Sequence, residues 1–443
     1  MRDKTVVQVI GTTGVGKSQL GIELAKRLAG EIINSDSMQV YKGLDIITNK
    51  HPEQKRDGIV HHLLGFLDQN AEYRIGAYER DATGIIDRLH EAGKMPVVVG
   101  GTAYYSTSLV FQDMLPDTGA TTPDLAGSID ARLEKTTSEL YQDLQGIDPV
   151  MATRWHPKDH RKIRRSLEIY YTTGKRQSEL YSEQRATGRL GPENVRYRTL
   201  FFWLWSDQSV LDTRLDARID EMIETGLFGE IKSMHQSQDT STPDFTRGIY
   251  QAIGYKEFHN FLQTGNEADR VAGTEAMKAA TRRYARKQIK WIRNKLLLQC
   301  RQAGDDVQVV LLDATDLSKW DENVLARALK AIDDYATTGP FDPRTYCDPS
   351  LHDLLRPKVE KEFSANPDLW EKFVCDVCPT FTTNTKEGWT QHLSSNGHRA
   401  KVKQAKKRQD FVDWKKSQKL GSRSNSDSSR SSELSRPAVL TGS

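Results

Sequence analysis

The chain has 443 residues, of which 37% are hydrophobic and 28% charged, so it can bury a core and form about two to four domains. Its four cysteines argue against a disulfide framework and indicate a reducing compartment. No apolar run reaches the ~18 residues of a transmembrane helix, so we expect no contact with a membrane. The net charge of +3 is small, but it is unevenly distributed along the chain.

Residues 1–115 alternate strand patterns with helix patterns, which is typical of a parallel, doubly wound α/β sheet. We predict strands at Val6–Ile10, Glu31–Asn34 and Lys94–Val99, and helices at 19–29 and 80–91. Each strand leads into a polar segment, at residues 11–18, 35–39 and 100–105. Because the carboxyl ends of parallel strands lie at one edge of a sheet, we expect these three segments to form one site.

A glycine-rich loop stands between the first strand and the first helix. It matches the pattern G-x-x-x-x-G-K-S, and its residues are the candidate phosphate ligands: Gly11, Thr12, Thr13, Gly14, Val15, Gly16, Lys17 and Ser18. The glycines let backbone N–H groups converge on an anion, and the following helix adds the positive end of its dipole. Lys17 supplies a full charge, and Ser18 supplies a hydroxyl that can ligate Mg²⁺. The motif predicts a bound phosphate or diphosphate and leaves the rest of the ligand open.

The segment 116–195 is polar, rich in arginine and lysine, and helical in pattern. We predict helices at Ala131–Leu144 and His160–Tyr170, and we interpret the segment as an insertion into the α/β domain. The core resumes over 196–335, with predicted strands at 199–205 and 307–312 and predicted helices at 211–225, 275–299 and 322–333. The helix at 275–299 has a strongly basic face. Solvated charge is the usual reason for such a face, and a polyanionic partner is the other.

The C-terminal part contains a small separate module. Residues 336–367 have the composition of a linker, and the module spans 368–419. Cys375 and Cys378, followed by His392 and His398, have the spacing of a tetrahedral zinc site, and a module this small can be stabilised by the metal itself. A basic run follows, which indicates nucleic-acid contact or nuclear import: Arg399, Lys401, Lys403, Lys406, Lys407 and Arg408. We expect the serine-rich tail at 420–443 to be disordered.

Several segments resemble the tRNA dimethylallyltransferases, which are also called tRNA isopentenyltransferases. The segments that carry the resemblance are 11–18, Asn34–Asp45, Val99–Tyr105, Asp159–Glu168, Ile253–Phe258 and Thr281–Trp291. Together they cover residues 5–300 in order, and the zinc module is similar to that of the eukaryotic branch, especially the fungal enzyme. The resemblance implies a P-loop NTPase-like parallel sheet with a helical tRNA-binding insertion and a C-terminal C2H2-type zinc finger.

The resemblance also implies an activity. In this family a five-carbon prenyl group is transferred from dimethylallyl diphosphate to N6 of adenosine 37, the adenine just 3′ of the anticodon. By resemblance Asp36 is the general base, and Lys17 and Thr102 are further catalytic residues, with Mg²⁺ beside the diphosphate and Zn²⁺ in the C-terminal module. Bacterial members have an arginine at the position of Gln251, and we expect Arg247 to supply this charge instead.

The same resemblance implies a set of contacts with the tRNA anticodon stem-loop. These contacts involve Asp36, Ser37, Met38, Gln39, Thr102, Arg161, Lys162, Ile163, Arg164, Arg165 and Gln251. An adenine inside a stacked loop must be flipped out to reach such a site. We expect a monomer in the cytoplasm, with the mitochondrion and the nucleus as further compartments.

Two other functions fit parts of the sequence. A small-molecule P-loop kinase needs an apolar strand that ends in an acidic Mg²⁺ ligand, and Val309–Asp313 has that form. A non-catalytic zinc-finger RNA-binding protein with a vestigial core would not need an intact Lys17 or Asp36. Asp36 itself can be a turn or cap residue within Asn34–Ser37. Phosphate release from ATP would favour the kinase, and RNA binding without prenyl transfer would favour the vestigial core.

Overall fold

The computed structural model describes residues 4–69, 71–112, 128–129, 131–186, 192–236, 245, 248–337, 339, 341–357, 373–378, 381–383, 386–408 and 410–411. Arg247 and the predicted disordered tail at 420–443 lie outside the described residues. The chain divides into two compact units, residues 1–117 with 183–360 and residues 118–182 with 361–443. No described helix is long and apolar enough to cross a membrane.

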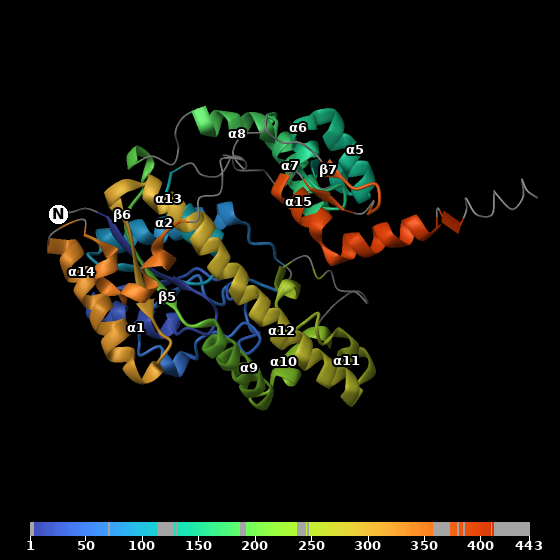
Figure 1. Ribbon diagram of the computed structural model, residues 1–443. Coiled ribbons are helices and arrows are strands. Elements are labelled where there is room, and N and C mark those ends of the chain that lie inside the picture. Colours follow the sequence, from blue (N-terminus) through green and yellow to red (C-terminus); the bar gives the residue numbers. More distant parts are fainter. Residues whose placement is uncertain are drawn as a thin grey trace, which may run out of the picture. The chain divides into compact units, whose positions relative to one another are not determined.

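The first unit is built on a six-stranded parallel sheet (Figure 1), which confirms the predicted α/β fold. The strands are β1 (Thr5–Gly11), β2 (Glu31–Asn34), β3 (His61–His62), β4 (Pro96–Val99), β5 (Arg198–Trp205) and β6 (Val307–Asp313). They lie in the order β3-β2-β4-β1-β5-β6. The central strands are almost continuously apolar because helices cover both faces of a parallel sheet.

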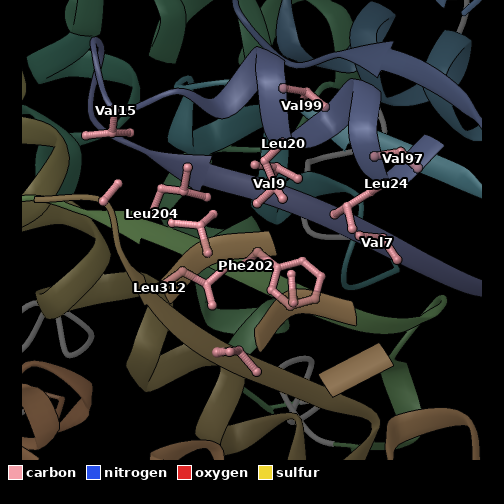
Figure 2. Close-up of a cluster of buried hydrophobic side chains, with 14 of the residues drawn as sticks. Val7, Val9, Val15, Leu20, Leu24, Val97, Val99, Phe202, Leu204 and Leu312 are labelled. Carbon is pink, nitrogen blue, oxygen red and sulfur yellow. The ribbon is translucent and has the colours of Figure 1, made fainter. Parts of the chain in front are cut away.

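Alternate residues of the strands belong to different cores. On one face, Val7 and Val9 pack with Leu20 and Leu24 (Figure 2), and the helices there are α1 (Lys17–Arg27), α9 (Gln208–Glu224) and α14 (Arg327–Thr337). The opposite face carries Val6 and Ile10. Its helices are α2 (Ile75–Glu91), α3 (Ala103–Ser108) and α13 (Leu297–Gln302), together with a π-helical turn at Ile292–Leu296 that continues α12 (Glu267–Trp291).

The loop after β2 packs on a further group of helices in the same unit. Val40, Leu44 and Ile47 are buried against the end of α9, α10 (Leu227–Gln236), α11 (His259–Thr264) and α12. The Glu230 carboxylate accepts the N–H groups of Ile46 and Ile47 at 2.9 and 2.7 Å. These contacts fix the loop that carries residues 36–39.

The second unit contains the helices of the insertion and the C-terminal module. The helices are α5 (Thr137–Ile147), α6 (Pro149–Arg154), α7 (His160–Thr173) and the first part of α8 (Gln177–Ala186). Their core consists of residues such as Leu140, Leu144, Met151, Ile163 and Leu167. The module has the strands β7 (Phe373–Val374) and β8 (Thr382–Thr383), the helix α15 (Lys386–Ser394) and a further helix over 396–408.

Several predicted helices have different bounds in the structure, and capping residues explain two of the differences. The helix predicted at Ala131–Leu144 is interrupted: residues 131–133 are helical, the chain is extended at Thr136, and α5 begins after it. Thr136 and Glu139 form a reciprocal capping box there, which satisfies the first free N–H groups of α5 and prevents one continuous helix. The helix predicted at 275–299 begins earlier, at Glu267, where the Asn266 side chain caps it.

Candidate active site

The ends of β1, β2 and β4 bring the three polar loops to one edge of the sheet, as the sequence predicts. Val99 of β4 pairs with Val9 of β1 on one side and with Asn34 of β2 on the other, so the three strands end at the same level. Gly100 approaches Ser35 so closely that an added Cβ would lie 2.1 Å from the Ser35 backbone. Only glycine permits this approach, which joins the loops of β2 and β4.

The glycine-rich loop has the conformation that anion binding requires. Gly16 has a φ of +93°, which L side chains rarely adopt, and it forms the N-cap of α1. The first N–H groups of α1 therefore face the loop, and no acidic residue occupies the first turn. The Lys17 Nζ donates to the Thr12 carbonyl at 2.7 Å, which holds the ammonium group within the loop.

Three ionisable side chains interact at this loop, and two are cations. Burial lowers the pKa of Lys17 to about 8, although the charge of Asp36 opposes the shift. Burial raises the pKa of Asp36, against the stabilising effect of the Met38 N–H group and of Lys17. Burial also lowers the pKa of Arg218 to about 10, and Glu221 and Asp36 oppose this. Glu221 is exposed. The charges within the loop itself are therefore those of Lys17, Arg218 and Asp36, and the two cations suit an anionic ligand.

Asp36 is held by a local turn. Its N–H group donates to Asn34 Oδ1 at 3.1 Å, and Asn34 Nδ2 donates to the Asp36 carbonyl at 3.0 Å and to the Leu63 carbonyl at 2.9 Å. Asp36 Oδ1 accepts the Met38 N–H at 3.0 Å. The turn that the sequence allows is therefore present, and it places the carboxylate close to Lys17 and Arg218 rather than in solvent.

Thr102 links the loop of β4 to the loop of β2. Its Oγ1 accepts the Ser37 N–H at 2.9 Å and donates to Ser37 Oγ at 3.2 Å. The Thr102 N–H also donates to the Ser35 carbonyl at 3.1 Å. Thr102, Ser37 and Asp36 are thus brought together, although 65 residues separate Thr102 from Ser37 in sequence.

Three residues that the sequence did not single out complete the site. Arg218 of α9 donates from Nη2 to Thr13 Oγ1 at 2.8 Å. Gln288 of α12 accepts the Thr13 N–H at 2.9 Å and donates to the Gly101 carbonyl at 3.0 Å, which ties the loops of β1 and β4 together. Tyr284 lies one turn before Gln288, and burial and the charge of Asp36 raise the pKa of its hydroxyl. Tyr284 and Gln288 lie within Thr281–Trp291, a segment that carries the family resemblance, but neither is assigned a role by it, and Arg218 lies in no such segment.

A small cavity lies next to the glycine-rich loop. It is lined by Ile10, Gly11, Gly100, Gly101, Ala103, Ser106, Gln288, Trp291, Ile292 and Leu296. The lining is mostly apolar or small, and Gln288 supplies its amide. The cavity therefore adjoins both the anion site and the π-helical turn after α12, a feature often found at functional sites.

Other predicted site residues have more varied environments. Val15 is buried under the loop, and Ser18 is half-buried at the start of α1. Gln39 donates to the carbonyls of Thr48 and Asn49, both at 3.1 Å, and thereby closes its own loop. Met38 packs against the cluster that contains Tyr41. Gln251 is exposed and donates to the Gly248 carbonyl at 3.2 Å, and among the described residues it forms no hydrogen bond with Asp36 or Lys17.

The predicted tRNA-contacting residues of α7 also differ from one another. Arg161 and Lys162 are exposed, and Lys162 lies 4.9 Å above the Trp155 ring. Ile163 is completely buried in the helical core, so its role is in packing. Arg164 and Arg165 each form an ion pair with Glu168, at 3.4 and 3.2 Å.

The four predicted metal ligands of the C-terminal module converge. Cys375, Cys378, His392 and His398 each offer a ligand atom within 4.8 Å of the others. His398 Nδ1 lies 3.5 Å from Cys375 Sγ, and the Cys378 N–H donates to Cys375 Sγ at 3.2 Å. The Phe381 ring stacks on His392 at 3.6 Å, and His392 Nε2 is buried without a hydrogen-bond partner among the described residues. This unsatisfied nitrogen among two thiols and a second imidazole fits a bound metal ion such as zinc.

The acidic residue that a kinase would need lies elsewhere in the sheet. Asp313 ends β6, the edge strand, and β5 separates it from β1. Its carboxylate accepts the Thr315 N–H at 2.9 Å. The strands next to β1 lead into Gly100 and Ser206. Asp207, which follows Ser206, is exposed, and its carboxylate caps α9.

Fold and site together define an α/β enzyme of the phosphate-binding-loop class, with a half-buried carboxylate beside the anion site. Residues 39–295 match the family model described as IPP transferase. The chain is 40% identical to the tRNA dimethylallyltransferase of Saccharomyces cerevisiae, over 93% of this chain and 95% of that one. It is 35% identical to the tRNA dimethylallyltransferase of Homo sapiens, over 92% and 87% of the two chains.

A solved structure is also similar. The crystal structure of a eukaryotic dimethylallyltransferase acting on tRNA matches with a TM-score of 0.79 at 38% identity, and the match covers 93% of this chain and 100% of that one. The chain belongs to the tRNA dimethylallyltransferase family, also described as the IPP transferases.

Proposed function

We propose that this chain transfers the dimethylallyl group of dimethylallyl diphosphate to N6 of adenosine 37, just 3′ of the anticodon, in tRNA. The observation that carries the proposal is the half-buried Asp36 carboxylate, which interacts with the cations Lys17 and Arg218 beside a glycine-rich anion loop. Such a site can bind a diphosphate at the loop and accept a proton from an amine at the carboxylate.

The loop holds the diphosphate, which is the leaving group. Lys17 and Arg218 supply positive charge, and the N–H groups at the start of α1 supply fixed donors. As the bond from carbon to the diphosphate oxygen breaks, negative charge grows on that oxygen, and these groups stabilise it without reorganising. The hydrogen bond from Arg218 to Thr13 Oγ1 fixes the guanidinium at the loop before the ligand binds.

Asp36 is the general base that takes a proton from N6. Because burial raises the pKa of its carboxyl, Asp36 is a stronger base than an exposed aspartate. The turn through Asn34 and Met38 fixes the direction of the carboxylate. Thr102 and Ser37, which are hydrogen-bonded to each other, lie beside it and supply hydroxyls to the entering base.

Two metal ions belong to this proposal. Ser18 lies at the first turn of α1, where a hydroxyl fits a Mg²⁺ ion bound to the diphosphate, and Mg²⁺ would supply additional neutralisation of the leaving group. Cys375, Cys378, His392 and His398 would hold a structural Zn²⁺ ion. The exposed basic residues that follow His398 would contact tRNA phosphates.

The proposal is tested with radiolabelled dimethylallyl diphosphate and an anticodon stem-loop whose adenine 3′ of the anticodon is flanked by adenines. We expect label to enter the RNA at that adenine with the wild-type protein and not with Asp36→Ala, although Asp36→Ala still binds the stem-loop. Normal turnover by Asp36→Ala would reject Asp36 as the base. The absence of label with the wild-type protein would reject the proposed reaction.

A further inference from the structure

Two neighbouring tyrosines of α3 have opposite environments. Tyr105 is only 4% exposed, and its ring stacks on Tyr78 with 3.8 Å between ring centroids. Tyr104 is 67% exposed, the largest value among the exposed hydrophobic side chains of the described residues. Tyr105 therefore belongs to the core, whereas Tyr104 presents its ring to solvent only two residues after Thr102.

Trp291 forms an aromatic pair with this exposed tyrosine. The two ring centroids lie 6.0 Å apart, with an angle of 56° between the ring planes. Trp291 also lines the cavity beside the glycine-rich loop, together with Gln288 and Gly101. The Tyr104–Trp291 pair is thus located where the active site opens to solvent.

The basic residues of α12 form two stripes, and only one of them is neutralised within the chain. Lys278, Arg282 and Arg286 each pair with an aspartate of α9. Those aspartates are Asp220, Asp216 and Asp212, respectively. We call Arg283, Lys287 and Lys290 the open stripe: all three are exposed, and among the described residues no hydrogen bond or ion pair involves them.

Helical geometry places the open stripe beside the aromatic pair. Arg283, Lys287 and Trp291 are spaced at i, i+4 and i+8, so they follow one another along one side of α12. Tyr104 is exposed and Trp291 is half-buried. Accessible aromatic rings next to unpaired cations are the combination that binds single-stranded nucleic acid, because bases stack on the rings and phosphates contact the cations.

We propose that Tyr104 and Trp291 form a stacking platform for a nucleotide base adjacent to the flipped adenine, and that the open stripe contacts the phosphates of the same loop. This inference rests on the proposed function, since it assumes a single-stranded RNA loop at the active site. The platform replaces stacking that the neighbouring base loses when the adenine leaves the loop. Tyr104 is then a residue that determines which RNA loops are accepted.

The first test is a double-mutant cycle between the protein and the RNA. Prenyl transfer is measured with stem-loops that carry an abasic nucleotide on the 5′ or on the 3′ side of the target adenine. We expect kcat/KM to fall between about 5-fold and 100-fold for one of the two abasic stem-loops and by a similar factor for Tyr104→Ala with the intact stem-loop. Tyr104→Phe should retain the wild-type value, because the ring is kept.

The diagnostic result is the combination of both changes. If the base stacks on Tyr104, Tyr104→Ala should cause little further loss with the sensitive abasic stem-loop. Multiplicative losses, or full activity of Tyr104→Ala with the intact stem-loop, would overturn the proposal. Val271→Ala, an exposed apolar position near the start of α12, is the control and should behave as wild type.

The second test compares adjacent cations of α12. Lys287→Ala removes a member of the open stripe, and Arg286→Ala removes a cation that Asp212 already neutralises. The slope of log affinity for the stem-loop against log salt should decrease by about 0.7 for Lys287→Ala and should not change for Arg286→Ala. Equal slopes for the two variants would overturn the role of the open stripe.

These results can be separated from a failure of the proposed function. If the wild-type protein does not prenylate the intact stem-loop at all, the proposed function fails and the cycle cannot be measured. If it prenylates every stem-loop at the same rate, the function stands and the stacking platform is rejected.

Discussion

The active site of the first unit and the metal-ligand group of the C-terminal module are built in different ways. The active site rests on a sheet whose strands are buried on both faces, and hydrogen bonds through Thr102, Gln288 and Asn34 connect its loops. In the C-terminal module, Cys375 and Cys378 are the only buried residues of the part that the structure describes. The core can therefore shape its site without a ligand, whereas we expect the module to need a bound metal ion in order to fold.

The largest expected effect is the loss of the metal ion. Because a structural zinc ion contributes about 10–16 kcal/mol in modules of this size, Cys375→Ser should unfold the module and leave the core intact. We expect one zinc ion per chain in a colorimetric assay of wild-type protein and none in the variant, together with rapid proteolysis within residues 373–408. The thermal transition of the core is the internal control. A variant that keeps its zinc and its resistance to protease would contradict the contrast between the two sites.

The next effect concerns catalysis at a site that should remain folded. Asp36→Asn keeps the size of the side chain and removes the base, so the rate at saturating tRNA should fall about 10²- to 10⁴-fold. The affinity for the stem-loop should stay near the wild-type value, and the core should melt as a folded domain. Asp313→Asn, at the edge strand, is the matched control and should remain active. An active Asp36→Asn variant together with an inactive Asp313→Asn variant would favour a kinase.

The active site was only partly predictable from the sequence, for a physical reason. The glycine-rich loop, Asp36 and Thr102 follow strand ends, so local patterns and parallel topology place them together. Arg218 and Gln288 come from α9 and α12, and their direction depends on how these helices pack, which no local pattern specifies. The metal ligands were predictable in full as a group because their spacing alone defines the site.

Helix packing also determines which charges on the basic face of the helix predicted at 275–299 are neutralised within the chain. The sequence shows the charges of Arg282 and Arg286 but not that Asp216 and Asp212 of α9 lie opposite them. Their pairing divides the face into a neutralised stripe and an open stripe. The two explanations for a basic face, solvated charge and a polyanionic partner, must therefore be considered for each stripe separately.

A smaller effect is expected for the cation that α9 supplies. Arg218→Gln removes a charged donor from the diphosphate, and charge-assisted hydrogen bonds of this kind contribute about 1.5–3 kcal/mol. KM for dimethylallyl diphosphate should therefore rise between about 10-fold and 150-fold, with no change in the affinity for tRNA. Arg282→Gln, which breaks the ion pair with Asp216, is the control for the neighbouring helix contact. A loss confined to tRNA affinity would remove Arg218 from the diphosphate site.

The smallest effect is a dependence on pH that only the core site should show. Burial lowers the pKa of Lys17 to about 8, so the ammonium group loses its charge as the pH rises through this value. The affinity of the free enzyme for dimethylallyl diphosphate should decrease above that pH, by at most about tenfold per pH unit. Titration calorimetry between pH 6.5 and 9.5 measures this affinity, and Lys17→Arg is the control, because its side chain stays charged. A flat profile for the wild-type protein would contradict the lowered pKa of Lys17.

The most direct test of the central claim is the chemical identity of the RNA product. Wild-type protein is incubated with ¹⁴C-labelled dimethylallyl diphosphate, Mg²⁺ and the adenine-flanked anticodon stem-loop, and the RNA is digested to nucleosides and analysed by mass spectrometry. We expect N6-dimethylallyl adenosine at the position 3′ of the anticodon and one diphosphate released for each transfer. Stem-loop that binds but carries no label, with phosphate released from added ATP instead, would contradict it.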